Sequence, residues 1–208
     1  MGAINVVAGA GLLLLAAACA TPRYEPTAGV TKLTSPTRQV TVGPFEDQRS
    51  DKVPGQPDRI GDAWGGTGAA KWVVPFFVPV PITQPWQQQW TDALVGALRA
   101  RGVSTTVVVP ETAAGLADSL LLMGVVHEYS VSKLPFSPAK AHVKATVRIY
   151  DAANKALILE RTVEGRHEQM MGLDNDVMAM NGAVQKAVEQ FTMDPDVVAQ
   201  LAKPQNRL

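Results

Sequence analysis

Cysteine is almost absent from this chain of 208 residues, because Cys19 is its only one. A single cysteine excludes both a disulfide within the chain and a cysteine-rich zinc site. An excess of charge is also lacking: Lys plus Arg and Asp plus Glu number 19 each, so nothing indicates a nucleic-acid partner. Hydrophobic residues make up 46% of the sequence, which is enough to form a core. The length predicts about one domain.

The sequence begins with an apolar run that is too short to span a bilayer as a helix. The first 18 residues carry no charged side chain, and Val6 to Ala18 is apolar throughout its length. This run has about 13 residues, whereas a spanning helix needs about 20. Its length is typical of the hydrophobic region of a secretory signal peptide, and small residues suited to a signal peptidase close it.

The lone cysteine follows these small residues directly, in the order Ala16-Ala17-Ala18-Cys19. Ala17, Ala18 and Cys19 resemble the bacterial lipobox, in which the cysteine is diacylated and becomes the mature N-terminus; Ala16 stands where that motif usually has Leu. The resemblance implies a lipoprotein signal peptide over 1–18 and stable anchoring by acyl chains, such as diacylglycerol and palmitate, on Cys19. The residue after the cysteine is Ala20 and not Asp, which by the same resemblance implies the outer membrane, facing the periplasm. The alternative is a free Cys19 thiol behind an uncleaved anchor or an ordinary signal.

A polar, Pro-rich stretch separates the cysteine from the first periodic pattern. Residues 19–38 have no hydrophobic periodicity, so we expect a flexible tether with a root-mean-square reach of about 25 Å. The folded domain is expected over 39–203, with a long loop rich in Gly, Pro and Trp over 50–85.

Hydrophobic patterns in the rest of the chain predict one α+β domain. Two antiparallel strands joined by the turn at 151–155 are the clearest pattern, and we expect Asn154 to adopt a left-handed conformation there. The order predicts a mixed sheet of about five strands with two helices packed on one face. The expected strands are 40–45, 104–109, 119–131, 141–150 and 156–165. The expected helices are 86–101, with Trp90, Leu94 and Leu98 at four-residue spacing and Gly102 just past its end, one that begins near 175 and includes Phe191, and a short one over 195–202 with Asp194-Pro195 as its cap and first-turn proline.

Alternation within the strand at 119–131 predicts which side chains share a face. Leu121, Met123, Val125, His127 and Tyr129 fall on one side, with Leu120, Leu122 and Val126 on the other. Because both sets are apolar near the start of the strand, we expect its first half to be covered on both faces.

Several stretches together resemble the YajG-type bacterial lipoproteins, and more loosely the domain shared by curli-secretion lipoproteins and the TolB N-terminal domain. They are VTVGPFEDQR, ALRARGV, ADSLLLMGVV and VRIYDAANKALILERTVEG, followed by a C-terminal helix. The most family-like residues are Asp47, Arg49 and Arg59-Ile60-Gly61. The resemblance covers about residues 38–192 and implies a periplasmic location and this fold, without a known active site. Asp47 and Arg49 point the same way on an extended segment, which favours a structural clamp over a ligand site.

The segment from Trp72 to Ile82, WVVPFFVPVPI, is apolar and rich in proline. One interpretation is a buried loop or a broken edge strand that covers the sheet. The other is an exposed arm that inserts into a membrane or a groove on a partner. In that second case the contact residues are Trp72, Phe76, Phe77, Val78 and Ile82.

Candidate chemical motifs are incomplete. His127-Glu128 and His167-Glu168 each lack the second histidine of a zinc-protease motif, and the glycine-rich stretch at 61–71 lacks the Gly-Lys-Ser/Thr of a P-loop. His142 and His167 could face one another across a hairpin, although hydrogen-bonded strand histidines are the ordinary interpretation. Methionines at positions 170, 171, 178 and 180 indicate adaptable core packing, or copper binding as the sharper alternative.

The sequence therefore predicts a protein that is not an enzyme and that uses no cofactor and no metal. We expect a non-catalytic binding or assembly component of an envelope complex, which contacts the membrane through its lipid anchor and an envelope protein as its partner, with no role for nucleic acid. The alternative is an accessory component that carries lipid or a small apolar ligand between membranes; an envelope hydrolase is a third hypothesis.

Overall fold

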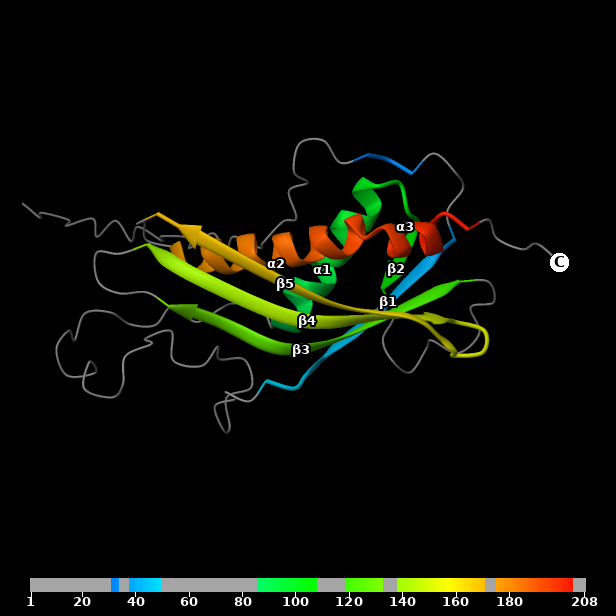
Figure 1. Cartoon of the computed structure of the whole chain (residues 1–208), viewed down its shortest axis with the longest axis horizontal. Helices are drawn as coiled ribbons and strands as arrows, with labels where there is room; N and C mark the ends of the chain where they lie inside the picture. The colour runs from blue at the N-terminus through cyan, green and yellow to red at the C-terminus, as the bar shows by residue number, and fades with distance from the viewer. Residues whose placement is uncertain are drawn as a thin grey trace, which may run out of the picture.

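A five-stranded mixed sheet forms one layer of the protein in this computed structural model, which describes residues 31–33, 38–49, 86–107, 119–132, 138–170 and 175–203. The strand order is β2-β1-β3-β4-β5 (Figure 1). β1 runs parallel to both β2 and β3, whereas β3, β4 and β5 form an antiparallel meander. The elements are β1 (Val40–Asp47), α1 (Trp86–Ala100), β2 (Thr105–Val107), β3 (Leu120–Ser132), β4 (Ala139–Asp151), β5 (Leu157–Gln169), α2 (Asn175–Met193) and α3 (Pro195–Leu201).

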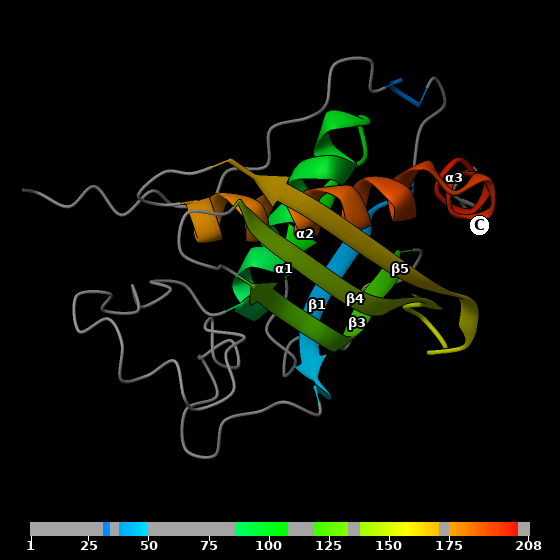
Figure 2. The ribbon, with the colours of Figure 1, turned by 60° about the vertical axis from the view of Figure 1, so that its left-hand side comes forward.

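The second layer consists of helices on one face of this sheet, as Figure 2 shows for α1 and α2. The four-residue spacing of Trp90, Leu94 and Leu98 places all three in the core. α1 ends where Gly102 adopts a positive φ of 84°, a conformation that glycine takes without steric cost. The predicted α+β class, the mixed sheet and the helices on one face are confirmed.

The long helix α2 lies unusually close to the edge strand β5. A Cβ atom added to Gly165 would lie 1.9 Å from the carbonyl oxygen of Ala183, and one added to Gly182 would lie 2.4 Å from the ring of His167. Glycine at both positions therefore lets the helix backbone and the strand backbone touch.

A β-bulge in β3 changes the predicted faces of that strand. The register to β4 shifts between Val126 and Glu128, so one extra residue is inserted and the alternation is reset. As a result Tyr129 is fully buried in the core with Leu122 and Val126, and the prediction that it shares a face with Leu121 and Met123 is wrong. On the face away from the helices Met123 is 39% exposed but Val125 is 4% exposed, so the start of β3 is fully covered on one face and only partly covered on the other.

The turn between β4 and β5 differs in one residue from the prediction. The left-handed residue is Lys155, with φ of 57°, and not Asn154. The side chain of Asn154 instead accepts a hydrogen bond from the backbone N–H of Ala156, while Asp151 accepts bonds from Ala153 and Asn154. These side chains accept hydrogen bonds from backbone N–H groups of the turn, and the positive φ falls at Lys155, the residue after Asn154.

The short helix α3 is fastened to the sheet through its N-cap. Asp194 accepts hydrogen bonds from the backbone N–H groups of Asp196 and Val197, which confirms the predicted cap. Arg161 on β5 forms an ion pair with the same carboxylate at 3.1 Å and a second one with Asp196. The cap and the sheet therefore share one carboxylate.

The free edge of β5 is also bonded by side chains. The backbone N–H of Glu164 donates to the side-chain oxygen of Gln190 on α2 at 3.0 Å, and Arg161 donates to the backbone oxygen of Glu160 at 2.9 Å. Two backbone groups that an additional strand would use are thus already hydrogen-bonded.

The chain joins the domain at the end that carries the β4–β5 turn. The backbone N–H of Leu33 donates to the carbonyl of Arg101 just after α1, and Leu33 packs against the core. Arg38 donates from its backbone to Leu201 and pairs with Asp151 at 3.5 Å. Leu33 and Arg38, both within the predicted tether, therefore contact the domain.

Candidate functional site

A buried ion pair closes the opposite end of β1. The guanidinium of Arg49 meets the carboxylate of Asp47 in a two-pronged contact, with Nε–Oδ1 at 3.0 Å and Nη2–Oδ2 at 3.1 Å. The backbone N–H of Arg49 also donates to Oδ1, at 3.1 Å. The Arg49 side chain is fully buried and that of Asp47 is 12% exposed. The pairing expected from their spacing is confirmed, and the carboxylate is used within the chain.

A second buried polar pair lies beside the Asp47–Arg49 pair and belongs to β3 and α1. The phenol of Tyr129 donates a hydrogen bond to the side-chain oxygen of Gln89. Burial raises the pKa of the Tyr129 phenol far above its usual range, and the positive charge of Arg49 opposes that change. Tyr129 is therefore a neutral donor at physiological pH.

Aromatic packing completes this end of the domain. The rings of Phe45 and Trp90 are stacked, with centroids 5.4 Å apart. The Phe45 ring covers Gly124, where an added Cβ would lie 1.9 Å from a ring carbon. We call Asp47, Arg49, Gln89 and Tyr129 the polar clamp: the Asp47–Arg49 pair lies at the end of β1, the Tyr129–Gln89 bond links β3 to α1, and the charge of Arg49 acts on Tyr129.

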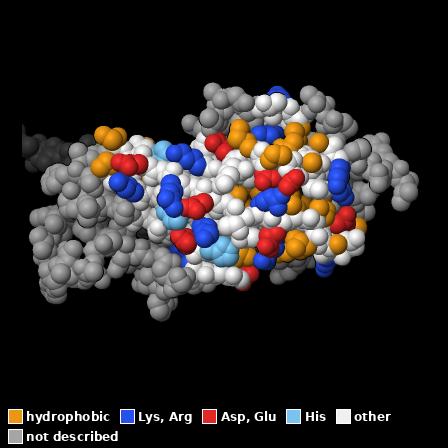
Figure 3. Space-filling model, in the orientation of Figure 1, with side chains coloured by type: hydrophobic (Ala, Val, Ile, Leu, Met, Phe, Trp, Pro, Cys, Tyr) orange, Lys and Arg blue, Asp and Glu red, His pale blue; other side chains and the backbone are white. Residues whose placement is uncertain are grey.

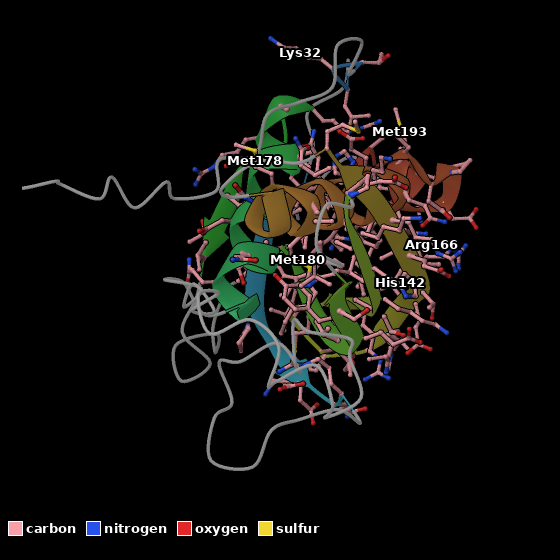
Figure 4. The ribbon with its side chains drawn as sticks, turned by 90° about the vertical axis from the view of Figure 1, so that its left-hand side faces the viewer. Lys32, His142, Arg166, Met178, Met180 and Met193 are labelled. Atoms are coloured by element: carbon pink, nitrogen blue, oxygen red, sulfur yellow. The ribbon has the colours of Figure 1, made fainter. Side chains whose placement is uncertain are left out.

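The face of the sheet away from the helices carries alternating charges (Figure 3). The imidazole of His142 lies between two carboxylates, with Nδ1 3.2 Å from Glu128 and Nε2 2.8 Å from Glu164. Hydrogen bonds from Arg166, and next from His142, hold the pKa of Glu164 below its usual range. Figure 4 shows His142 and Arg166 on this outer face, whereas Met180 points into the layer between α2 and the sheet. Further pairs on this face are Lys140–Glu168, Lys144–Glu128 and Arg148–Glu160.

The three histidines have ordinary strand partners. His127 bonds Thr146 at 2.8 Å, and His167 bonds Gln169 at 3.4 Å. His167 packs against Gly182 of α2 whereas His142 lies on the outer face, so the interpretation that these two face one another is wrong. Within the described ranges, no group of three or more His, Cys, Asp or Glu side chains is arranged to hold a metal ion.

The methionines divide into two kinds. Met180 is buried in the core, which agrees with its interpretation as a packing residue. Met170 and Met178 are exposed at 71% and 54%, so these two do not fill the core.

The predicted site residues fall outside the described residues. These are the lipidation site Cys19, the contact residues Trp72, Phe76, Phe77, Val78 and Ile82, and the glycine-rich stretch at 61–71. The two described residues that flank the segment 50–85 are Arg49 and Trp86, so the polar clamp lies where that segment begins.

Sequence reasoning found the ion pair in the clamp but missed its other half. A spacing of two residues on a strand places Asp47 and Arg49 together, whereas Gln89 and Tyr129 are 40 residues apart and meet only in the folded protein. The same holds for Arg161 and Asp194, which are 33 residues apart. In the described part of the chain, no helix is both long enough and apolar enough to cross a membrane.

The described residues define a two-layer α+β domain with a parallel β2-β1-β3 part and an antiparallel β3-β4-β5 part. A Xanthomonas campestris protein of the DUF330 family shares this fold, with a TM-score of 0.54 and 17% identity over 87% of this chain and 91% of that one.

Two further solved structures show lower similarity. The PelC dodecamer from Paraburkholderia phytofirmans has a TM-score of 0.45 and 13% identity over 85% of this chain and 96% of that one. The lipoprotein GNA1162 from Neisseria meningitidis has a TM-score of 0.37 and 14% identity over 67% of this chain and 90% of that one. No protein-family model and no curated protein matches the chain. The resemblance to the YajG-type lipoproteins therefore stays a prediction.

Proposed function

We propose that this protein is a lipid-anchored component of the bacterial envelope, held at the outer membrane and facing the periplasm, which binds or assembles other envelope proteins without catalysing a reaction. The observation that carries the proposal is the sequence Ala17-Ala18-Cys19 directly after an apolar run, with Cys19 as the only cysteine. Acylation at this position would leave a single folded domain attached to the membrane surface.

The arrangement of polar groups in the domain supports a binding role. Asp47 and Arg49, the most family-like polar residues, pair with each other and do not present their charges at a surface. Their position fixes the start of the segment 50–85, in which the apolar contact residues lie. A rigid clamp directly before an apolar stretch of the sequence is suited to a role in which that stretch binds a partner.

Mass spectrometry of the protein purified from membranes tests the anchor. We expect a mature chain that begins at Cys19 and carries acyl chains, and a Cys19→Ser variant that loses both the acyl mass and the membrane fraction. A free thiol in the unaltered protein, or an unchanged distribution of the variant, would contradict the proposal.

Crosslinking in cells tests the partner. A photoreactive residue in place of Phe76 or Phe77 is expected to capture a recurrent envelope protein. In a pull-down from solubilised envelope, deletion of 72–82 is expected to abolish recovery of that protein while the domain remains folded. The matched control carries the photoreactive residue at Lys140, an exposed position on the outer sheet face. Equal capture from Lys140 and from the Phe positions would contradict a specific contact.

The alternative function, transfer of lipid between membranes, requires an apolar channel between sheet and helices. Where α2 crosses β5 the two backbones are in contact at Gly165 and Ala183, so a lipid chain cannot pass there. The described residues offer no specific observation that favours this alternative.

A further inference from the structure

Three connections gather at the end of the domain where the chain enters. Arg38 bonds Leu201 at the end of α3 and pairs with Asp151 at the β4–β5 turn. Leu33 bonds Arg101 after α1. The α1 end, the α3 end and the β4–β5 turn therefore surround the point at which the chain joins the fold (Figure 1). We call this region the entry end.

The entry end carries basic side chains without acidic partners. Lys32, Lys155 and Lys203 are exposed, and Arg99 is exposed in the last turn of α1. Lys203 donates to the neutral Gln200, and Arg99 donates to Thr105. Among the described residues, none of these four cations is within ion-pair distance of a carboxylate.

The acidic residues at the same end are already paired. Asp151 pairs with Arg38, and both Asp194 and Asp196 pair with Arg161. At the opposite end of β4 and β5 the cations are paired as well, in Lys140–Glu168 and Lys144–Glu128. Among the described residues, the exposed cations outside ion pairs are therefore Lys32, Arg99, Lys155 and Lys203 at the entry end and Lys186 on α2, although the protein as a whole has no net charge.

Exposed apolar side chains accompany these cations. Leu157, directly after the β4–β5 turn, is 53% exposed, and Met193, directly before the α3 cap, is 56% exposed. A surface that combines lysines with accessible apolar groups fits the headgroup region of a bilayer, where each basic residue contributes about 1 kcal/mol of attraction to anionic lipid.

The length of chain that leads to this end supports the same orientation. Thirteen residues separate Cys19 from Leu33 in the sequence. A flexible segment of that length has an end-to-end distance of about 20 Å. β1, which runs from the entry end to the polar clamp, is longer, because its 8 residues extend over about 26 Å. An anchor at Cys19 therefore holds the entry end nearer to the membrane than the end with the polar clamp.

We infer that the entry end, through Lys32, Lys155, Lys203 and the neighbouring Leu157 and Met193, is a surface that binds anionic phospholipid headgroups of the membrane holding the anchor. This inference rests on the proposed lipid anchor and adds an orientation to it. The polar clamp, and with it the start of the segment 50–85, then faces away from the bilayer.

Site-specific fluorescence quenching in the acylated full chain tests the orientation. Because Cys19 is the only cysteine and acylation occupies its sulfur, a single added cysteine can be labelled. Ala153→Cys reports the entry end and Met170→Cys the opposite end of β5. In vesicles containing anionic phospholipid and a headgroup quencher, we expect quenching at least threefold stronger at position 153. Equal quenching, or stronger quenching at position 170, would overturn the inference.

Binding by the unanchored chain tests the lysines separately from the anchor. For the Cys19→Ser chain with anionic vesicles at low salt, each removed entry-end charge is expected to lower the partition coefficient about fivefold. The triple variant Lys32→Gln, Lys155→Gln, Lys203→Gln should therefore lose more than tenfold. The control Lys140→Gln, Lys144→Gln, Lys186→Gln has the same net charge and should lose less than twofold. Equal losses, or binding that does not depend on the charge of the lipid, would overturn the inference. An unacylated Cys19 would overturn the proposed anchor and the orientation that rests on it, and would leave the binding of anionic lipid by the lysines to be judged by this measurement.

Discussion

The α-carbon of Gly165 on β5 faces the carbonyl oxygen of Ala183 on α2 so closely that an added methyl group would lie 1.9 Å from that oxygen. The neighbouring atoms are backbone, which cannot rotate away as a side chain can. This contact fixes the distance between the helix and the edge strand, and hence the depth of the core beneath α2.

Gly165→Ala is expected to destabilise the protein by about 3 kcal/mol, because the helix must move away from the sheet to admit the methyl group. Chemical denaturation of the purified domain measures the effect. Gly43→Ala is the matched control on β1: its Cβ would lie 3.4 Å from the nearest atom, the flexible side chain of Met123, so a change below about 0.5 kcal/mol is expected. Equal destabilisation by both would contradict the close contact.

Removing one partner of the buried ion pair should cost more than removing both. Arg49→Met leaves the Asp47 carboxylate without its guanidinium partner, and a loss of about 3–5 kcal/mol is expected. In the double variant Asp47→Leu, Arg49→Met no buried charge remains, so part of that loss should be recovered. Denaturation of the two single variants and the double variant gives the coupling energy, and additive losses would show that the pair is not a unit.

The Tyr129 phenol should resist ionisation in the folded protein. Its pKa is raised in the folded state and is near 10 when the chain unfolds, so its contribution to stability is complete below about pH 10 and is lost as the pH rises above that value. Absorbance at 295 nm during alkaline titration should show one of the three tyrosines ionising only with unfolding. Tyr129→Phe should remove the absorbance change that accompanies unfolding. It should also lower the free energy of unfolding by about 1 kcal/mol, because the side-chain oxygen of Gln89 loses its hydrogen-bond donor.

Acid should loosen α3 through its cap. Burial favours the neutral form of Asp194, but the N–H of Val197, the Arg161 guanidinium and the N–H of Asp196 outweigh it and hold the pKa of Asp194 below its usual range. Because the folded pKa is the lower one, this contribution is complete above about pH 4 and is lost as the pH falls through the folded value.

Two substitutions of Asp194 separate the stability that comes from capping α3 from the stability that comes from its negative charge. Asp194→Ala removes both the cap and the Arg161 pair, with an expected loss of about 1 kcal/mol. Asp194→Asn keeps an acceptor for the helix N–H groups and should lose less at pH 7, while both variants should show a weaker dependence of stability on acid. An unaltered acid dependence in both would contradict the role of this carboxylate.

Local patterns predicted those parts of the fold that depend on local chemistry. The four-residue spacing of Trp90, Leu94 and Leu98, the glycine after α1 and the Asp194-Pro195 cap all form within one element, and each was predicted. The placement of Tyr129 was not, because the bulge at Val126 depends on the register that β3 adopts against β4. Strict alternation carries no signal for such an insertion.

The same distinction applies to the candidate site. The Asp47–Arg49 pair follows from two residues on one strand, whereas its neighbours Gln89 and Tyr129 come from a helix and a distant strand. The separation of His142 from His167 likewise depends on strand register, since a shift of one residue would pair the two on the same face. Contacts over long sequence distances need the topology, which hydrophobic patterns alone do not supply.

The hydrogen bonds that Gln190 and Arg161 make at the edge of β5 bear on how neighbouring copies of the protein would interact. Lipid-anchored molecules are confined to two dimensions, where neighbours meet often and an unprotected strand invites stacking into fibres. Because the Glu164 N–H and the Glu160 carbonyl are already hydrogen-bonded, a strand from a neighbouring copy could not form a continuous set of backbone hydrogen bonds with β5. In the proposed anchored state, these two bonds therefore oppose the pairing of neighbouring copies through β5.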